Sequence, residues 1–344
     1  MKIIDLRSDT VTLPSPAMRK ALSTAELGDD VFGEDPTTNL LERMAADFVG
    51  MEDALLVPSG TMGNLTCLLT HCGRGEEVIL GNLSHTFIYE AGGMAALGGI
   101  HPHTLPNLPD GTIPLDDIAG AIRDDNVHFP RTRLITLENT HNLCNGSPLS
   151  PAYIDDVAAI ARAHDIPIHM DGARLFNAAV AMDVNVKSMT RNVDSLTFCL
   201  SKGLAAPVGS LVCGSRDFIV KARRTRKILG GGMRQCGIIS VAGIVALEEM
   251  IERLAEDHAH ARRLAEGISH IAGLTVQPDM VKTNIVYFSL DTTDISPEKL
   301  VTALERQGVK FLHTGRSRFR MVTHYGISTD DIERTLSALS RAMA

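Results

Sequence analysis

Three short segments, each directly after an apolar run, hold residue types that suit the binding or activation of a small molecule. The first is the turn Ser59-Gly60-Thr61, which follows the apolar run 54–57. Small and hydroxylated residues at the start of a helix expose backbone N–H groups, and that geometry suits a phosphate. An ordinary strand-to-helix turn capped by Thr61 explains the same residues when the turn is considered alone.

The other two segments contribute a carboxylate and an amine. Asp171 follows the apolar run 166–170. Its carboxylate is suited to bind a metal, to cap a helix beside Arg174, or to pair with the nitrogen of a pyridine ring. Lys202 follows the run 195–200, where partial desolvation favours the neutral amine and hence Schiff-base formation with a carbonyl. A lysine whose ammonium group extends to solvent is the ordinary alternative.

Taken together, the three segments match what pyridoxal 5′-phosphate (PLP) requires of a protein. PLP needs a cradle for its phosphate, an acidic partner for its ring nitrogen and a lysine that forms a Schiff base. The combination is more specific than any one of its parts. The sequence therefore predicts a PLP site with the cofactor held on Lys202.

Alternating strands and helices have to position these segments. Apolar runs predict strands near 54–57, 78–80, 134–137, 166–170, 195–200 and 210–213, with helical patterns between them, including 85–97 and 151–164. This alternation predicts an α/β fold with a mostly parallel sheet covered by helices on both faces. Ligands of such sheets bind beyond the carboxyl ends of the strands, where all three segments lie.

The pattern changes near the end of the chain, and this change predicts two domains. We expect a large PLP-binding domain over 1–250, with an N-terminal arm over 1–50, and a small α+β domain over 251–344. A long helical pattern runs from about 237 to 270 and allows a break. Beyond it, strands are predicted at 284–290 and 318–323, and helices at 297–307 and 329–342.

Composition excludes several other classes of protein. The formal net charge is −8 and no long basic block occurs, which argues against nucleic-acid binding. The sequence contains no run of about 18 apolar residues, so no membrane span is predicted. The six cysteines show no paired C-x-x-C spacing, as expected of buried thiols in a reducing compartment. The acidic Asp5 interrupts the first apolar run, so no signal peptide is predicted and a cytoplasmic protein is expected.

Seven segments resemble the L-threonine aldolase family. They are 5–12, 28–36, 58–64, 137–142, 169–174, 200–203 and 230–235, within a collinear similarity from residue 4 to about 326. The resemblance implies the aspartate-aminotransferase-like fold of PLP enzymes, known as fold type I. It also implies a homotetramer with active sites at a dimer interface. The implied reaction cleaves L-threonine, L-allo-threonine and related β-hydroxy-α-amino acids to glycine and an aldehyde.

The resemblance also assigns roles to single residues. The implied catalytic residues are Lys202, His85 and His128, where one histidine or a water takes the β-hydroxyl proton and His85 stacks on the cofactor ring. The implied cofactor site consists of Gly60, Thr61, His85, Asp171, Arg174, Lys202, Lys227 and Arg234, with Lys227 and Arg234 reaching the phosphate from a neighbouring subunit. The implied clamp on the substrate carboxylate consists of Ser8, Arg174 and Arg320, because arginine binds carboxylates through two nitrogens. No metal is expected.

Two departures from the family pattern bear on substrate range. Phe32 stands where many relatives have tyrosine, and the segment 143–147 differs from the usual loop. Two alternatives stay open: another PLP enzyme of this fold, such as a β-eliminating lyase, and a PLP-binding protein without catalysis. A nicotinamide-dependent enzyme is disfavoured because G-x-G-x-x-G does not follow the first strand of the sheet.

Overall fold

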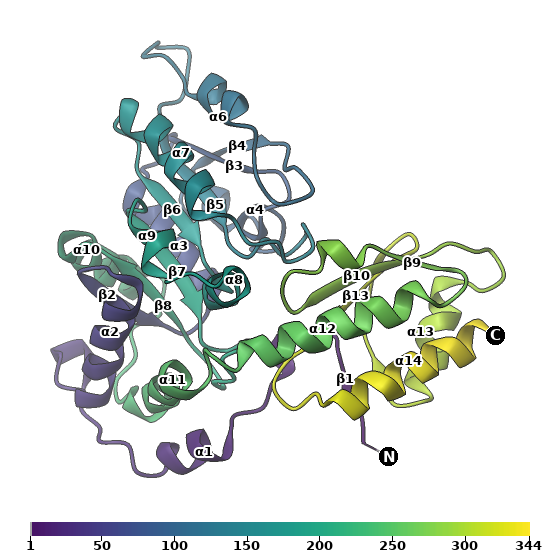
Figure 1. The fold of residues 1–344 in the computed structure, drawn as a ribbon. Coiled ribbons are helices and arrows are strands. Elements are labelled where there is room, and N and C mark those ends of the chain that lie inside the picture. Colours follow the sequence, from purple (N-terminus) through teal and green to yellow (C-terminus); the bar gives the residue numbers. More distant parts are fainter. Residues whose placement is uncertain (1) are drawn as a thin grey trace.

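The computed structural model describes residues 2–344 and has two lobes (Figure 1). The larger lobe is built around a seven-stranded sheet and the smaller one around a four-stranded sheet. The strands of the large sheet are β2 (Asp53–Val57), β3 (Glu77–Gly81), β4 (His101–Leu105), β5 (Thr132–Glu138), β6 (Ile168–Asp171), β7 (Ser195–Cys199) and β8 (Ser210–Gly214). Every predicted strand of this sheet is present.

The large sheet has the strand order β2-β8-β7-β6-β5-β3-β4. Only β8 runs antiparallel to its neighbours, so the predicted mostly parallel sheet is confirmed. The carboxyl ends of β2, β3, β6 and β7 consequently lie at the same edge. That edge carries the three segments that the sequence marks for cofactor chemistry.

Helices cover both faces of the large sheet. They are α2 (Pro36–Val49), α3 (Gly60–His71), α6 (Leu115–Ala121), α7 (Pro151–Ala163), α8 (Leu175–Met182), α9 (Lys187–Thr190), α10 (Arg216–Ile228) and α11 (Gly237–Glu249). Strand β2 shows the two layers clearly. Ala54 and Leu56 pack into the main core with α2, whereas Leu55 and Val57 pack against α3 and α10 on the other face. Alternate residues of a strand point to opposite faces, which produces this division.

The segment predicted as one helix over 85–97 forms two short helices, α4 (His85–Ile88) and α5 (Gly93–Ala96). Ala91 and Gly92 between them have φ angles of 53° and 65°. A left-handed backbone cannot continue a right-handed helix, so the chain turns there. Just before this turn, Glu90 contacts His85 at the start of α4.

The smaller lobe contains β9 (Leu274–Val276), β10 (Ile285–Leu290), β12 (Leu312–Gly315) and β13 (Arg318–Val322) in the antiparallel order β12-β13-β10-β9. Its helices are α12 (Leu254–Ser269), α13 (Pro297–Glu305), α14 (Thr329–Met343) and the short η3 (Pro278–Met280). The predicted long helix over 237–270 is interrupted after α11, and α12 extends across to the smaller lobe (Figure 1).

The start of the chain belongs structurally to the smaller lobe. Strand β1 (Ile4–Asp5) pairs in parallel with β11 (Val309–Lys310), and Ile4 and Leu6 are buried in the core of that lobe. The sequence places these residues in an arm of the large domain instead. The rest of the N-terminal segment, with η1 (Asp9–Val11), α1 (Pro16–Leu22) and η2 (Asp30–Phe32), runs along the larger lobe.

Among the described residues, no helix combines the length and the apolar character that crossing a membrane would require.

Candidate active site

A cavity of about 340 Å³ lies at the carboxyl edge of the large sheet. The turn before α3, the start of α4, the end of β6 and the segment after β7 all contribute to its wall. Five of the residues that the sequence marks line this one cavity, namely Gly60, Thr61, His85, Asp171 and Lys202. Residues far apart in the chain are thus brought together as the topology of the sheet predicts.

The turn before α3 offers backbone donors to the cavity. Ser59, not Thr61, is the N-cap residue, and its Oγ accepts a hydrogen bond from the Met62 amide at 3.2 Å. The first amides of a helix have no acceptor within the helix, so those of Gly60 and Thr61 are available to an anion. A Cβ at Gly60 would come within 2.8 Å of the Cys199 Sγ, so only glycine lets the turn lie this close to β7.

Asp171 is buried at the end of β6 and is held by two donors. Its Oδ2 accepts from the Asn64 Nδ2 at 2.9 Å, and its Oδ1 accepts from the Ala173 amide at 3.1 Å. Both bonds fix the carboxylate toward the cavity that it lines. A fixed acidic oxygen next to Lys202 has the chemistry needed by the nitrogen of a pyridine ring.

A buried polar chain continues from Asn64 behind Asp171. The Asn64 Oδ1 accepts from the Thr197 hydroxyl at 2.6 Å and lies 3.2 Å from the His169 Nε2. The Ser195 Oγ then lies 3.0 Å from the His169 Nδ1 and 2.8 Å from the His71 Nε2. Burial lowers the pKa of His169 to about 4 and that of His71 to about 3. Both rings are therefore neutral near pH 7, and they orient the support of Asp171 without adding charge.

His85 is paired with Glu90 at the cavity wall. The His85 Nδ1 lies 3.0 Å from the Glu90 Oε1, and the same oxygen accepts from the Asn64 Nδ2 at 2.8 Å. Burial alone would lower the pKa of His85, but the hydrogen bond that His85 donates to Glu90 and the charge of Asp171 outweigh it, and the pKa of His85 is raised. Burial also raises the pKa of Glu90. The Glu90 carboxylate thus favours the protonated imidazole of His85.

One ligand atom each of His85, Glu90 and Asp171 lies within 4.8 Å of the other two, a spacing that a metal ion could use. However, the Asn64 Nδ2 donates to both carboxylates. An N–H group that donates to two carboxylates reduces their mutual repulsion, as a bound cation would. The cluster is therefore explained by hydrogen bonding.

Arg174 and Arg320 both bind the segment 7–9, which contains Ser8. The Arg174 Nε and Nη2 donate to the two carboxylate oxygens of Asp9 at 2.7 and 2.8 Å, and the Arg320 Nη2 donates to the Arg7 carbonyl at 3.1 Å. Although Asp9 is fully buried, this pairing holds its pKa well below the ordinary range. The predicted two-nitrogen grip of Arg174 on a substrate carboxylate is not available while Asp9 holds Nε and Nη2.

Arg320 also connects the two lobes. Its Nη1 donates to the Asn142 Oδ1 at 2.9 Å, and its Nε is buried without an acceptor among the described residues. An unsatisfied buried donor on a cation is costly, so this guanidinium is suited to accept an anionic partner. Ser8 caps η1 through its Oγ, which accepts from the Thr10 amide at 3.2 Å.

Six predicted site residues do not line the cavity of this chain. They are Ser8, Arg174 and Arg320, described above, and His128, Lys227 and Arg234. His128 is on an exposed loop between α6 and β5, and Lys227 and Arg234 are exposed at and after the end of α10. Arg234 pairs with Asp29 at 3.0 Å. Phe32, the departure from the family pattern, is 72% exposed. The roles of His128, Lys227 and Arg234 accordingly stay predictions.

Sequence reasoning gave no role to Asn64, Glu90 or Asp9, which the structure places in or directly beside the site. Asn64 falls inside one of the motifs, one helical turn after Gly60. That spacing puts both residues on the same face of α3 and is the signal that could have revealed it. Glu90 lies outside all of the motifs. Asp9 lies inside the motif 5–12, but only the long-range contact with Arg174 gives it a role.

Comparisons with known proteins agree with this geometry. The family model described as Beta-eliminating lyase matches residues 5–291. Low-specificity L-threonine aldolase 1 of Arabidopsis thaliana is 48% identical, over 100% of this chain and 97% of the relative. A threonine aldolase structure from Leishmania major superposes with a TM-score of 0.85 at 21% identity, over 99% of this chain and 100% of that one.

A structure of SPT with PLP also superposes, with a TM-score of 0.76 at 19% identity over 99% of this chain and 87% of that one. At such identities the likeness to solved structures shows the fold. The predicted fold type I architecture is therefore confirmed.

Proposed function

Since this chain belongs to the Beta-eliminating lyase family and, within it, to the low-specificity L-threonine aldolases, we propose that it cleaves L-threonine and L-allo-threonine to glycine and acetaldehyde. Related β-hydroxy-α-amino acids would give glycine and the corresponding aldehyde. The arrangement of Lys202, Asp171 and the Gly60–Thr61 turn around one cavity carries the proposal. It supplies the three contacts that PLP needs.

The residues present fit PLP. The turn at Gly60, where a Cβ would meet the Cys199 sulfur, leaves room and free amides for a phosphate. Asp171 would hold the ring nitrogen, His85 would lie over the ring, and the Lys202 amine would hold the cofactor covalently. When bound, PLP supplies an electron-withdrawing ring that stabilises the electron pair left at the substrate α-carbon after bond cleavage.

The chain's own groups would orient the substrate. The free Nη1 of Arg174, the Arg320 guanidinium and the Ser8 hydroxyl would hold the α-carboxylate. Held in this way, the α-carboxylate would fix the orientation of the bond between Cα and Cβ for cleavage. His85 or His128, directly or through a water, would take the proton from the β-hydroxyl oxygen as the C–C bond breaks. The electrons of that O–H bond form the carbonyl of the aldehyde, and a proton delivered to the α-carbon then completes glycine.

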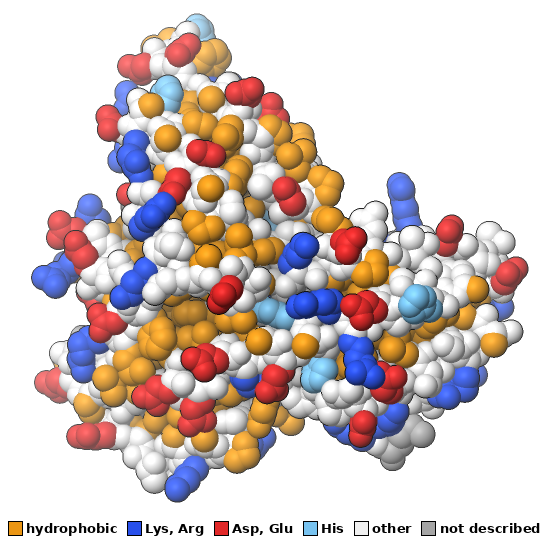
Figure 2. Space-filling view, viewed as in Figure 1, with side chains coloured by type: hydrophobic (Ala, Val, Ile, Leu, Met, Phe, Trp, Pro, Cys, Tyr) orange, Lys and Arg blue, Asp and Glu red, His pale blue; other side chains and the backbone are white. Residues whose placement is uncertain are grey.

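We also propose that a second copy of the chain completes each site. Helix α11 is apolar around most of its circumference, yet Ile238 is 48% exposed and Val241, Ile244 and Val245 are only partly buried. Figure 2 shows apolar side chains gathered over this part of the larger lobe. Such a surface fits a homotetramer in which Lys227 and Arg234 reach the phosphate of a neighbouring subunit. The six buried free cysteines fit a cytoplasmic location.

The test is product analysis with PLP-loaded protein. L-threonine and L-allo-threonine are supplied in parallel, and acetaldehyde and glycine are measured together. Equal amounts of both products, lost in Lys202→Ala, are the expected result. Pyruvate and ammonia from serine, with no glycine from either threonine, would instead establish a β-eliminating lyase, the alternative that the name of the family model favours.

A further inference from the structure

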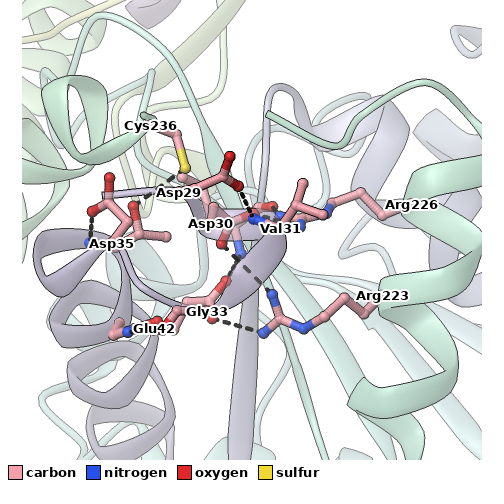
Figure 3. Close-up of polar contacts among 12 residues, drawn as sticks. Asp29, Asp30, Val31, Gly33, Asp35, Glu42, Arg223, Arg226 and Cys236 are labelled. Carbon is pink, nitrogen blue, oxygen red and sulfur yellow. Dashed lines mark hydrogen bonds and ion pairs between the residues drawn. The ribbon is translucent and has the colours of Figure 1, made fainter. Parts of the chain in front are cut away.

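Figure 3 shows a buried ionic cluster outside the cavity. It joins Asp30 in the loop before α2, Glu42 on α2, and Arg223 and Arg226 on α10. Asp30 and Arg226 are 3% and 2% exposed, so their charges are almost fully withdrawn from water. None of these four residues lines the cavity, and the mechanism above uses none of them.

Arg226 connects two segments of the chain through its two terminal nitrogens. Nη2 donates to the Asp30 Oδ2 at 2.7 Å, and Nη1 donates to the Leu56 carbonyl at 2.7 Å. Leu56 lies in β2, three residues before the Ser59 cap of α3. The guanidinium therefore fixes the end of the strand that leads into the turn at Gly60 and Thr61.

Strand β2 needs this support because it is an edge strand that pairs only with β8. The outward backbone groups of an edge strand have no partner strand. Here the Leu56 amide donates to the Glu42 Oε1 at 2.8 Å, while the Leu56 carbonyl accepts from Arg226. Arg223 holds Glu42 in turn, through Nη2 and Oε2 at 2.8 Å. The cluster thus replaces the missing strand at one residue.

The same cluster fixes the loop that follows α10. The Asp30 amide donates to the Arg234 carbonyl at 3.0 Å, and Arg234 pairs with Asp29. A Cβ at Gly231 would come within 2.2 Å of the Met62 Sδ and 3.0 Å of the Arg226 Cγ, so this loop also packs against the first turn of α3. Lys227 is the residue next to Arg226.

The cluster is not built for stability alone. The Arg226 Nε and the Asp30 Oδ1 are buried without a hydrogen-bond partner among residues 2–344, although the Arg223 Nη1 forms an ion pair with that Oδ1 at 3.7 Å. Buried ion pairs often contribute no more stability than well-packed apolar side chains of similar volume. The position of this guanidinium and its incomplete hydrogen bonding therefore favour a role in positioning the segments that it binds.

We propose that Arg226 is a positioning residue for the cofactor phosphate. It holds the end of β2 and the loop 28–36 at fixed positions, and so places the Gly60–Thr61 amides of its own site and the exposed Lys227 and Arg234 side chains. The inference rests on the proposed PLP site, and it adds a residue that makes no contact with the cavity.

The experiment compares Arg226→Met and Arg226→Lys with Arg224→Met, a control on the same helix whose side chain is exposed. PLP dissociation constants are measured by equilibrium dialysis of the apoproteins, and thermal unfolding of each apoprotein is followed by circular dichroism. For Arg226→Met we expect a PLP dissociation constant higher by roughly ten- to a hundredfold, by analogy with residues that orient the ligands of a bound metal. Arg226→Lys, which retains the charge but cannot reach both partners, is expected to recover part of the loss. The control should bind PLP as the wild type does.

A lower unfolding temperature with an unchanged dissociation constant would show a purely structural role and overturn the inference. If Arg226→Met does not fold, the test rests on Arg226→Lys. Wild-type PLP affinity in that variant would likewise overturn the inference. A wild-type protein that binds no PLP overturns the proposed function itself. Unchanged binding in the variants of a PLP-binding wild type overturns only the role of Arg226.

Discussion

Glu90 gives His85 its particular acid–base character. The carboxylate lies 3.0 Å from the His85 Nδ1, and this bond, together with the charge of Asp171, raises the pKa of His85 against the effect of burial. It also directs the ring so that Nε2 is the nitrogen left for the substrate side. If His85 is the base, it would act only above its pKa, and Glu90 would then set the acidic limit of the reaction.

Glu90→Gln removes the negative charge but keeps a side chain of the same shape. The pKa of His85 should fall, since burial then acts with less opposition. If neutral His85 is the base, the acidic limb of the kcat profile against pH shifts to lower pH, and kcat at pH 7 falls because a weaker base accepts the proton less readily.

The matched measurement is the same pH profile for His128→Asn, whose side chain lies on an exposed loop. An acidic limb that stays in place in Glu90→Gln but disappears in His128→Asn would assign the base to His128. A limb unchanged in both variants would point to a water or another group.

Which site residues the sequence reveals depends on how they are placed. Gly60, Asp171 and Lys202 each follow a strand, so strand prediction alone brings them to one edge of the sheet. Asp9 meets Arg174 across 165 positions, and no local pattern reports that contact. Glu90 reaches His85 from just beyond the end of α4, five positions along the chain, and no motif marks that contact.

At the scale of elements, η1 is tied to the larger lobe by the pair of Asp9 with Arg174, the N-cap residue of α8. Asp9→Asn would leave the Arg174 charge buried without its partner. We expect the free energy of unfolding to fall by about 3–5 kcal/mol, the usual cost of breaking a buried ion pair. Urea denaturation of the apoprotein measures it. A loss below about 1 kcal/mol would mean that water or another group replaces the carboxylate.

The same pair gives a pH dependence with a definite sign. The pKa of Asp9 is lower in the folded protein than its ordinary value of 3.8. A depressed carboxyl pKa contributes stability above the unfolded-state value, and that stability is lost as the pH falls below it. The difference in stability between wild type and Asp9→Asn should therefore shrink below about pH 4. A difference that stays constant down to pH 2 would contradict this account.

Strand β1 permits a sharp test of its place in the smaller lobe, because two neighbouring isoleucines differ in burial. Ile4 is fully buried in the core of that lobe, whereas Ile3 is 57% exposed. Ile4→Ala should lower the free energy of unfolding by about 2–5 kcal/mol, the range for truncating a buried aliphatic side chain. Ile3→Ala should change it by less than about 0.5 kcal/mol.

Hydrogen exchange locates the effect of Ile4→Ala. Amides of β1 and β11 should exchange faster, while those of β6 and β7 in the larger lobe keep their protection. Equal losses of unfolding free energy in the two isoleucine variants, or faster exchange confined to the larger lobe, would contradict the place of β1 in the smaller lobe.

Elements with a strong apolar period are the ones that sequence reasoning found. β3 and β5 to β8 are strongly apolar and buried, and all of them were predicted. β4 was missed because it is an edge strand, His-Pro-His-Thr-Leu, that carries no apolar run and is only partly buried. The pairing of β1 with β11 was missed because a two-residue strand leaves no pattern in the sequence.

At the scale of the whole molecule, one chain presents its proposed catalytic groups and its proposed phosphate-binding cations on different surfaces. Lys202 lines the cavity, but Lys227 and Arg234 are exposed and do not. In a symmetric dimer, each surface of one subunit can meet the complementary surface of its partner. Apolar residues near these cations are exposed and suit such a contact. Ile228 is 83% exposed and Phe32 is 72% exposed.

Subunit complementation tests this division of labour. Lys202→Ala lacks the lysine that would hold PLP, and the double variant Lys227→Ala/Arg234→Ala lacks the cations that would serve the partner. Each is expected to be nearly inactive alone. After mild dissociation and reassembly of an equal mixture, half of the dimers are hybrids, and each hybrid has one site with Lys202 from one subunit and both cations from the other. The mixture should regain roughly a quarter of wild-type activity. If Lys227 and Arg234 act within their own chain, every hybrid site lacks one part or the other, and reassembly restores no activity.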